Sequence, residues 1–211
     1  MKSRSGFHPA RAAAGVLALL LCVGASGCEV VFTTSLLTFL QRDPAGLSPE
    51  QQVAWAEQAL ASGDREAMAE AYGVVKDDPA NALLAARLAL ELSGVPGVMN
   101  DVLLDLDTFL DFTDPLDLEA YFDAQAASVD TAYASAAGGH FAAVLAADAS
   151  QLSGVDMVLG ALCLAFAEAD PGGFGTLAAA GPTDSFIADC LAVLPADDPA
   201  VEILNQLALV I

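Results

Sequence analysis

The stretch from Ser48 to Asn81 decides the fold, and it reads SPEQQVAWAEQALASGDREAMAEAYGVVKDDPAN. Ser48 is followed three residues later by Gln51, a pair that satisfies free backbone amides at the start of a helix. Gly63-Asp64 then interrupts the apolar pattern. Asp78-Pro79 ends it, because proline disfavours a helical conformation in the residue before it. The stretch predicts a helix, a short turn, a second helix and a stop.

The Asp-Pro stop recurs at a regular distance along the chain. Three such pairs are separated by 35 and 36 residues: Asp43-Pro44, Asp78-Pro79 and Asp114-Pro115. Asp148 follows after a further 34 residues, although no proline accompanies it. About midway between these stops, further breaks are expected at residues 94–97 and at Gly138-Gly139. Each unit therefore predicts two helices joined by a short turn.

Apolar residues recur at helical spacing between these breaks. Examples are Leu84, Leu88 and Leu92, and near the end of the chain Ile187, Leu191 and Leu194. Alanine and leucine dominate, and β-branched residues are sparse outside residues 30–34. Apolar residues make up 55% of the chain, which argues against disorder. We expect an all-α domain over residues 48–211, built from antiparallel helical hairpins that stack on one another.

A helical hairpin that recurs near 34 residues has the period of the tetratricopeptide repeat, or TPR. The segment from Gln51 to Asn81 resembles that family: Gly63-Asp64 falls at the turn between the helices, Tyr72 at the aromatic position of the second helix, and Pro79 at the closing proline. It departs from the family in lacking the Leu-Gly pair of the first helix. The resemblance implies a short TPR-like solenoid or superhelix whose concave face suits a peptide, a helix or a small ligand.

The first 28 residues have the layout of an export signal. Basic residues at Lys2, Arg4 and Arg11 precede an apolar run from Ala12 to Val23, and small residues then lead into Cys28. An ordinary secretory signal would share this layout. An uncleaved membrane span is the other alternative, although residues 12–27 are short for a span, which needs about 20 apolar residues.

The cysteine makes this segment resemble a bacterial lipoprotein signal. The resemblance implies that residues 1–27 are a signal peptide, that the Cys28 thiol is lipidated, and that residues 28–47 form a lipidated segment and tether. The mature protein would then be anchored in the bacterial cell envelope and face the periplasm. Glu29 is not the aspartate that favours inner-membrane retention in enteric bacteria, which slightly favours the outer membrane.

The chain is strongly acidic. Without residues 1–27, four basic residues stand against 28 acidic ones, and no lysine or arginine occurs from Leu88 to Ile211. Such a surface repels nucleic acid, because binding phosphate needs cations. It suits a cationic partner, divalent ions or simply solubility. The densest acidic run includes Asp101, Asp105, Asp107 and Asp111. We expect these four to belong to a solvated helix face, with a face for a basic partner or a cation as the alternative.

Residues with catalytic or metal-binding chemistry are few. His140 is the one histidine left after removal of the signal, and beside Gly138-Gly139 we expect it at a helix start, as a turn residue. An EF-hand aligned on Asp105 is excluded, because Leu110 stands where glycine is required. Residues 173–178 (GFGTLA) match the dinucleotide-binding pattern only nominally, because they follow a predicted helix and not a strand. No other catalytic or cofactor signature occurs in the sequence. We therefore expect a protein that is not an enzyme and that holds no metal or cofactor.

Two further cysteines belong to the domain. If Cys28 is lipidated, Cys163 and Cys190 remain as an even pair in an oxidising compartment, where disulfides form. Both fall on apolar helix faces, so each could equally be a small core residue. The sequence predicts either a disulfide between them or two buried thiols.

These observations predict a non-catalytic, membrane-anchored envelope lipoprotein that acts as a TPR-like scaffold or adaptor. Its partners would be the membrane, through the N-terminal lipid, and a protein with a basic or amphipathic segment. The alternative is a small-ligand-binding lipoprotein resembling the TPR component associated with TRAP-type transporters. A ligand role predicts an enclosed, partly apolar cavity, whereas an adaptor predicts an open groove.

Overall fold

The computed structural model describes residues 44–104, 115–169 and 181–210. The chain divides into two compact units, Met1–Leu47 and Ser48–Ile211. Of the first unit, the described part is the short 3-10 helix η1 (Pro44–Gly46) with Leu47, whose amide donates to the Pro44 carbonyl at 3.2 Å. The predicted lipidation site, Cys28, lies outside the described residues.

The described part of the second unit is helical and contains no strand, so the predicted all-α class is confirmed. Its elements, in chain order, are α2 (Pro49–Ser62), α3 (Arg65–Val75), η2 (Pro79–Asn81), α4 (Ala82–Ser93), α5 (Val95–Leu104), α7 (Pro115–Ala126), α8 (Thr131–Asp148), η3 (Ala149–Gln151), α9 (Gly154–Ala169), α10 (Pro182–Val193) and α11 (Pro199–Val210).

The predicted helix-turn-helix forms at the expected residues. The Ser48 side chain accepts from the Gln51 amide, and the Gln51 side chain accepts from the Ser48 amide, so the capping box of α2 is complete. Gly63 ends α2 in the left-handed conformation, with φ of 68°, which glycine adopts without steric cost. Asp64 then caps α3 by accepting from the amides of Glu66 and Ala67.

The Asp-Pro pairs begin elements as much as they end them. Pro79 is the first residue of η2, Pro115 of α7 and Pro199 of α11. Two of the preceding aspartates act as caps: Asp198 Oδ1 accepts from the Ala200 amide at 2.8 Å, and Asp78 Oδ1 accepts from the Ala80 amide at 3.0 Å. Proline suits the first helical position because its missing N–H would have no helical partner there.

The predicted break at Gly138-Gly139 is wrong, because both glycines lie inside the continuous helix α8. A Cβ atom on Gly138 would lie 2.5 Å from Cγ of Leu164 in α9, so the missing side chain allows α8 and α9 to approach closely. His140 consequently lies in the middle of a helix and not at a helix start.

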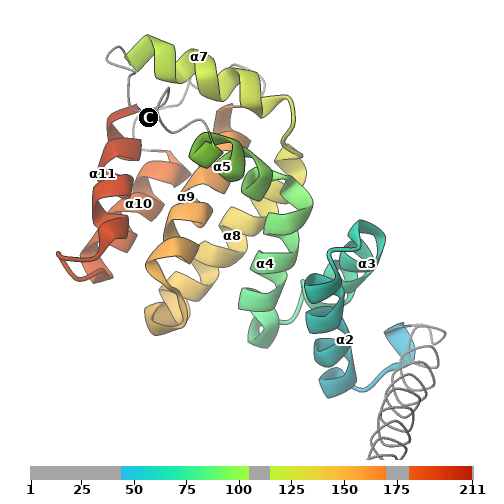
Figure 1. Ribbon diagram of the computed structural model, residues 1–211. Coiled ribbons are helices and arrows are strands. Elements are labelled where there is room, and N and C mark those ends of the chain that lie inside the picture. Colours follow the sequence, from blue (N-terminus) through green and yellow to red (C-terminus); the bar gives the residue numbers. More distant parts are fainter. Residues whose placement is uncertain (1–43, 105–114, 170–180, 211) are drawn as a thin grey trace, which may run out of the picture. The chain divides into compact units, whose positions relative to one another are not determined.

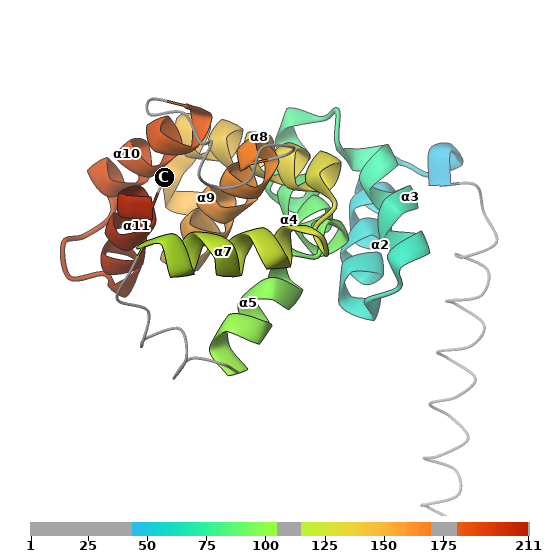
Figure 2. The same cartoon turned by 90° about the horizontal axis from the view of Figure 1, so that it is seen from above.

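The helix pairing after α4 departs from the expected succession of hairpins. α2, α3 and α4 are neighbours in chain order, but α4 then packs most extensively on α8, and α8 on α9. α5 does not fold back along α4: the segments Pro79–Ser93 and Val95–Asp101 meet at a bend of 61°. α10 and α11 pack on α9, while α5 and α7 lie to one side of the stack, where α7 contacts α11 (Figures 1 and 2).

The core lies where α4, α8 and α9 meet the C-terminal helices. Its fully buried large side chains include Leu88, Leu92, Phe141, Phe166 and Leu204. Burying each such side chain contributes about 1.5–3 kcal/mol. Among the described residues, no single helix has the length and apolar composition to cross a membrane, and the bent pair Pro79–Ser93 with Val95–Asp101 meets those criteria only as two joined segments.

Candidate functional site

A hollow of about 340 Å³ lies where the end of α3, η2 and the start of α4 meet the second half of α8; we call it the α3–α8 hollow. Apolar side chains, including Leu83 and Val144, form part of its wall. Polar residues line the rest: Lys76, Asp77, Asp78, His140 and Gln151. Seven of its twelve lining residues are exposed, so the hollow opens to solvent.

The charged residues of the α3–α8 hollow are already engaged with one another or with the backbone. Lys76 Nζ donates to both carboxylate oxygens of Asp77, at 2.9 and 2.8 Å, and these hydrogen bonds raise the pKa of Lys76. Asp78 accepts from the Ala80 amide and, at 3.1 Å, from Nδ2 of Asn81. The three charged side chains together leave the hollow with a net negative charge.

An aromatic cluster beside the hollow joins α3 to α8. The Tyr72 ring meets the Tyr133 ring edge to face, with centroids 5.7 Å apart, and meets the His140 ring at 5.9 Å. The Tyr72 hydroxyl and His140 Nε2 lie 3.3 Å apart, within hydrogen-bond distance. Tyr133 and His140 are seven residues apart in α8, which places them on one face of the helix.

The half-buried imidazole of His140 is held neutral near pH 7. Burial lowers the pKa of His140 below its usual 6.5, and the positive charge of Lys76 lowers it further. Burial likewise raises the pKa of Tyr72. Sequence reasoning interpreted His140 as a turn residue and missed this cluster. Tyr72 and His140 are 68 positions apart, and nothing local marks their contact.

The α3–α8 hollow places one imidazole and two carboxylates around a single opening. His140, Asp77 and Asp78 all line it, yet among the described residues no hydrogen bond or ion pair joins the imidazole to either carboxylate. General acid–base catalysis needs such groups within reach of a shared proton. No serine, threonine or cysteine lines the hollow, and the described residues include no cluster of three or more His, Cys, Asp or Glu that could hold a metal ion.

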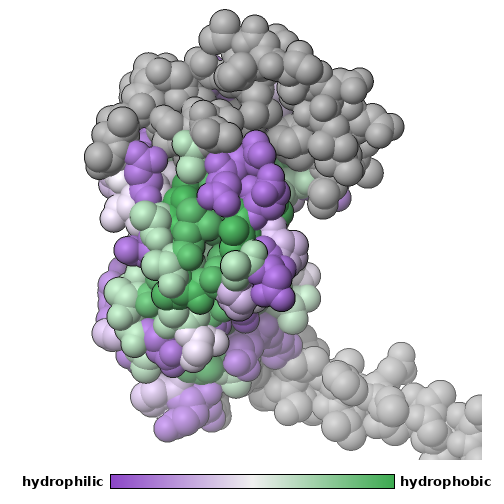
Figure 3. Space-filling view, turned by 90° about the vertical axis from the view of Figure 1, so that its left-hand side faces the viewer, coloured by the Kyte–Doolittle hydropathy of each residue, from purple (hydrophilic) through white to green (hydrophobic). Residues whose placement is uncertain are grey.

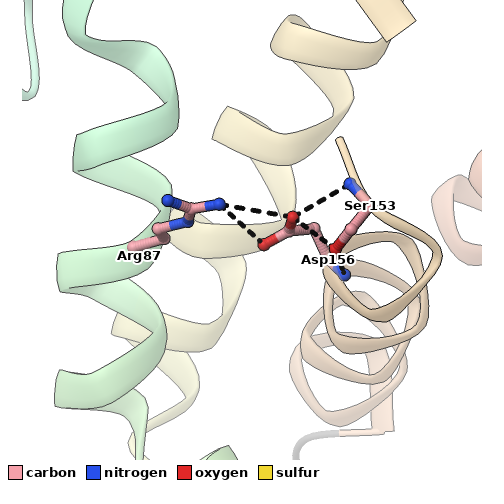
Figure 4. A network of polar contacts seen from close by, with 3 residues as sticks. All are labelled: Arg87, Ser153 and Asp156. Atoms are coloured by element: carbon pink, nitrogen blue, oxygen red, sulfur yellow. Dashed lines mark hydrogen bonds and ion pairs between the residues drawn. The ribbon is translucent and has the colours of Figure 1, made fainter. Parts of the chain in front are cut away.

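A second polar network fixes α4 to the start of α9 (Figure 4). Asp156 Oδ2 accepts from the backbone amide of Ser153 at 3.0 Å and from its hydroxyl at 2.7 Å, while the Asp156 amide donates back to Ser153 Oγ. Arg87 of α4 reaches the same carboxylate at 3.4 Å. The Ser-x-x-Asp spacing could have revealed the cap, but no local pattern indicates that Arg87 is its partner.

The balance of effects keeps Asp156 charged. Burial is the largest effect and acts to raise its pKa, but the Ser153 hydrogen bonds and the Arg87 charge together hold the pKa of Asp156 below its usual value. Its side chain is only 12% exposed. Removing these partners would leave a nearly buried carboxylate without compensation.

Every lysine and arginine of the second unit is paired with a carboxylate. Arg65 lies 4.0 Å from Asp130, Lys76 lies 2.8 Å from Asp77, and Arg87 lies 3.4 Å from Asp156. No other lysine or arginine occurs from Ser48 to Ile211, whereas all but two of the 28 acidic residues do. The unit therefore carries a large surplus of negative charge and no cation without an acidic partner.

The predicted acidic face is described only in part. Asp101 is exposed on α5, whereas Asp105, Asp107 and Asp111 lie outside the described residues. Cys163 in α9 and Cys190 in α10 are buried and have free thiols in the structure. Burial raises the pKa of each thiol to about 12.

No protein-family model, curated protein or solved structure matches this chain. The candidate site therefore stands on the geometry and charge described above.

Proposed function

We propose that this chain is a lipid-anchored lipoprotein of the bacterial envelope, acting as a non-catalytic scaffold for a protein partner with a basic or amphipathic segment. The observation that carries the proposal is the charge arrangement of the second unit. Arg65, Lys76 and Arg87 are each paired with a carboxylate. The electrostatic field that an approaching segment meets is therefore set by the remaining acidic groups. Such a field attracts cationic segments and repels phosphate.

The N-terminal sequence supports the proposed address. Cys28 follows a basic segment and a short apolar run, and a thiol at that position is the acylated group of bacterial lipoproteins. We propose that residues 28–47 connect the lipid to the helical unit, which begins at Ser48. The lipid would hold the scaffold at a membrane surface while the acidic unit stays in the aqueous space.

The TPR-like architecture is part of the same proposal. In its support, α2, α3 and α4 pack in chain order, and the capping box, Gly63 and Asp64 fall at the expected places in the first hairpin. α8 takes the place beside α4 that the next helix would fill in a regular solenoid. The proposed architecture is thus a short helical array into which α5 and α7 are inserted.

The openness of the α3–α8 hollow favours a scaffold over the small-ligand alternative. Its volume of about 340 Å³ falls at the lower end of the range of about 300–1,000 Å³ for small-molecule pockets. Such pockets usually bury most of their ligand. Asp77, Asp78, Pro79 and Gln151 of its wall are exposed, which suits contact with a larger partner.

Affinity capture from detergent-solubilised envelopes tests the proposal. The tagged full-length chain should retain a protein whose bound region is rich in lysine or arginine, and raised salt should release it. In parallel, Cys28→Ala should move the chain from the membrane to the soluble envelope fraction. Retention of acidic proteins alone, or of none, would contradict the scaffold, and continued membrane association of Cys28→Ala would contradict the lipid anchor.

A further inference from the structure

The two ends of the helical array differ in the polarity of their outer surfaces. α2 and α3, at one end, are described throughout and expose polar side chains such as Glu57, Gln58, Glu66 and Glu70. Among the described residues, the large apolar side chains that are exposed belong to the other end: Val155 of α9, Val193 of α10 and Ile203 of α11. The last helix pair of a repeat array normally presents a polar outer face, which keeps the array soluble.

One side of the molecule carries an apolar strip on its surface (Figure 3). Figure 3 faces the side that carries α10 and α11 and shows an apolar strip bordered by hydrophilic residues. Val193 and Ile203 are 49% and 50% exposed. The start of α9 approaches the start of α11, since a Cβ on Gly154 would lie 2.8 Å from that of Ala200. We call the exposed surface of α10 and α11, which includes Val193 and Ile203, the terminal face.

The charges around the terminal face are of one sign. Asp189 on α10, Asp197 in the connection to α11 and Glu202 on α11 are all exposed. The sequence has no lysine or arginine after Arg87, so no basic side chain of α9, α10 or α11 offsets them. A second copy of this chain would bring the same acidic border and would be repelled.

We infer that the terminal face binds an amphipathic helix of the partner, with apolar residues on one side and flanking lysine or arginine residues. The apolar side would cover Val193 and Ile203, and the basic flanks would meet Asp189, Asp197 and Glu202. A helix can present both chemistries at once, because residues three and four apart share a face. The helix would continue the array by one element. This inference rests on the proposed function and names the partner's chemistry and its docking place.

Capture by the full-length chain with two variants tests the inference. Val193→Ser/Ile203→Ser removes the apolar contacts from half-exposed positions, where folding is little affected. The control Ala188→Ser/Asn205→Ser changes exposed residues of the same two helices. Each control position lies about 140–160° around its helix from the tested one. We expect the first variant to retain at least about fivefold less partner than the wild-type chain, and the control to retain an unchanged amount.

Photo-crosslinking then identifies what occupies the face. A photoreactive residue at position 203 should attach to a partner segment with an apolar face and basic flanks, whereas one at position 205 should not. Attachment to a second copy of this chain, or to an acidic or wholly polar segment, would overturn the inference. Undiminished capture by Val193→Ser/Ile203→Ser would overturn it while leaving the proposed function intact. Capture of no partner by the wild-type chain would remove both.

Discussion

Gly138 of α8 lies so close to Leu164 of α9 that a Cβ atom on the glycine would be 2.5 Å from Leu164 Cγ and 2.6 Å from Cδ2. The backbone amide of Leu164 is 3.3 Å from the same point. Gly139, the next residue, has nothing within 4 Å of its own Cβ position. Two adjacent glycines in one helix therefore have different roles, and only the first sets the distance between α8 and α9.

This contrast predicts opposite effects for the same substitution at neighbouring positions. Gly138→Ala should lower the free energy of unfolding by about 1–3 kcal/mol, because the added methyl group overpacks the contact with Leu164. Gly139→Ala should leave stability unchanged or raise it by up to about 1 kcal/mol, since alanine is the better helix former. Urea unfolding followed by circular dichroism measures both. Equal effects at the two positions would contradict the described packing of α8 on α9.

The same pair of glycines shows where sequence reasoning succeeded and where it did not. The first hairpin was predictable because its signals are local: Ser48, Gln51, Gly63 and Asp64 specify ends by contacts within three residues. The sequence predicts a break at Gly138-Gly139, whereas the structure shows that Gly138 makes room for Leu164. Leu164 is 26 positions away in the chain, so no local signal indicates this role.

Other contacts that the sequence does not reveal have the same origin. The pairing of α4 with α8, in place of α5, depends on contacts between segments that are far apart in sequence. The aromatic contact of Tyr72 with His140 and the ion pair of Arg87 with Asp156 likewise join distant residues. Helix class and helix ends follow from local propensity and capping, whereas the choice of neighbour is a property of the whole core.

The Asp156 network predicts a specific dependence of stability on pH. Because the pKa of Asp156 is lowered in the folded state, its stabilising effect is complete above the usual value of 3.8 and is lost as the pH falls through the lower, folded value. Asp156→Ala should cost about 1–3 kcal/mol near neutral pH. The exposed Asp189→Ala should change the unfolding free energy by less than about 0.5 kcal/mol. Unfolding curves at pH 7 and pH 3 test this, and an equal cost at both values would contradict it.

The neutral state of His140 predicts a second dependence on pH, in a different range. Because the pKa of His140 is lowered by burial, folding is fully favoured above about 6.5 and weakens as the pH falls from there through the folded value. NMR titration of residues 29–211, which contain one histidine, should give a midpoint below 6.5. His140→Gln should remove the loss of stability that occurs as the pH falls from 6.5 through the folded-state pKa of His140. A midpoint at or above 6.5 would contradict the burial of the ring beside Tyr72.

The two buried thiols predict a simple chemical result. The pKa of Cys163 and of Cys190 is raised to about 12, so little thiolate forms near pH 8. A thiol reagent should therefore react slowly with Cys163 and Cys190 in the folded fragment 29–211. After the fragment is unfolded in the absence of reductant, the reagent should modify both cysteines promptly. If Cys163 and Cys190 have formed a disulfide, the unfolded protein will give no thiol reaction at all, and the free-thiol description will be wrong.

The salt dependence of partner binding measures whether the acidic surplus of the second unit attracts a cationic segment, as we propose. Arg65, Lys76 and Arg87 are already paired, so the remaining carboxylates are available to act on the partner. The Debye length falls from about 30 Å at 0.01 M salt to about 3 Å at 1 M. We expect the dissociation constant of the captured partner to rise at least about tenfold between 0.05 and 0.5 M sodium chloride, with folding unchanged. A dissociation constant that stays the same over this range would show that the acidic surplus does not attract the partner.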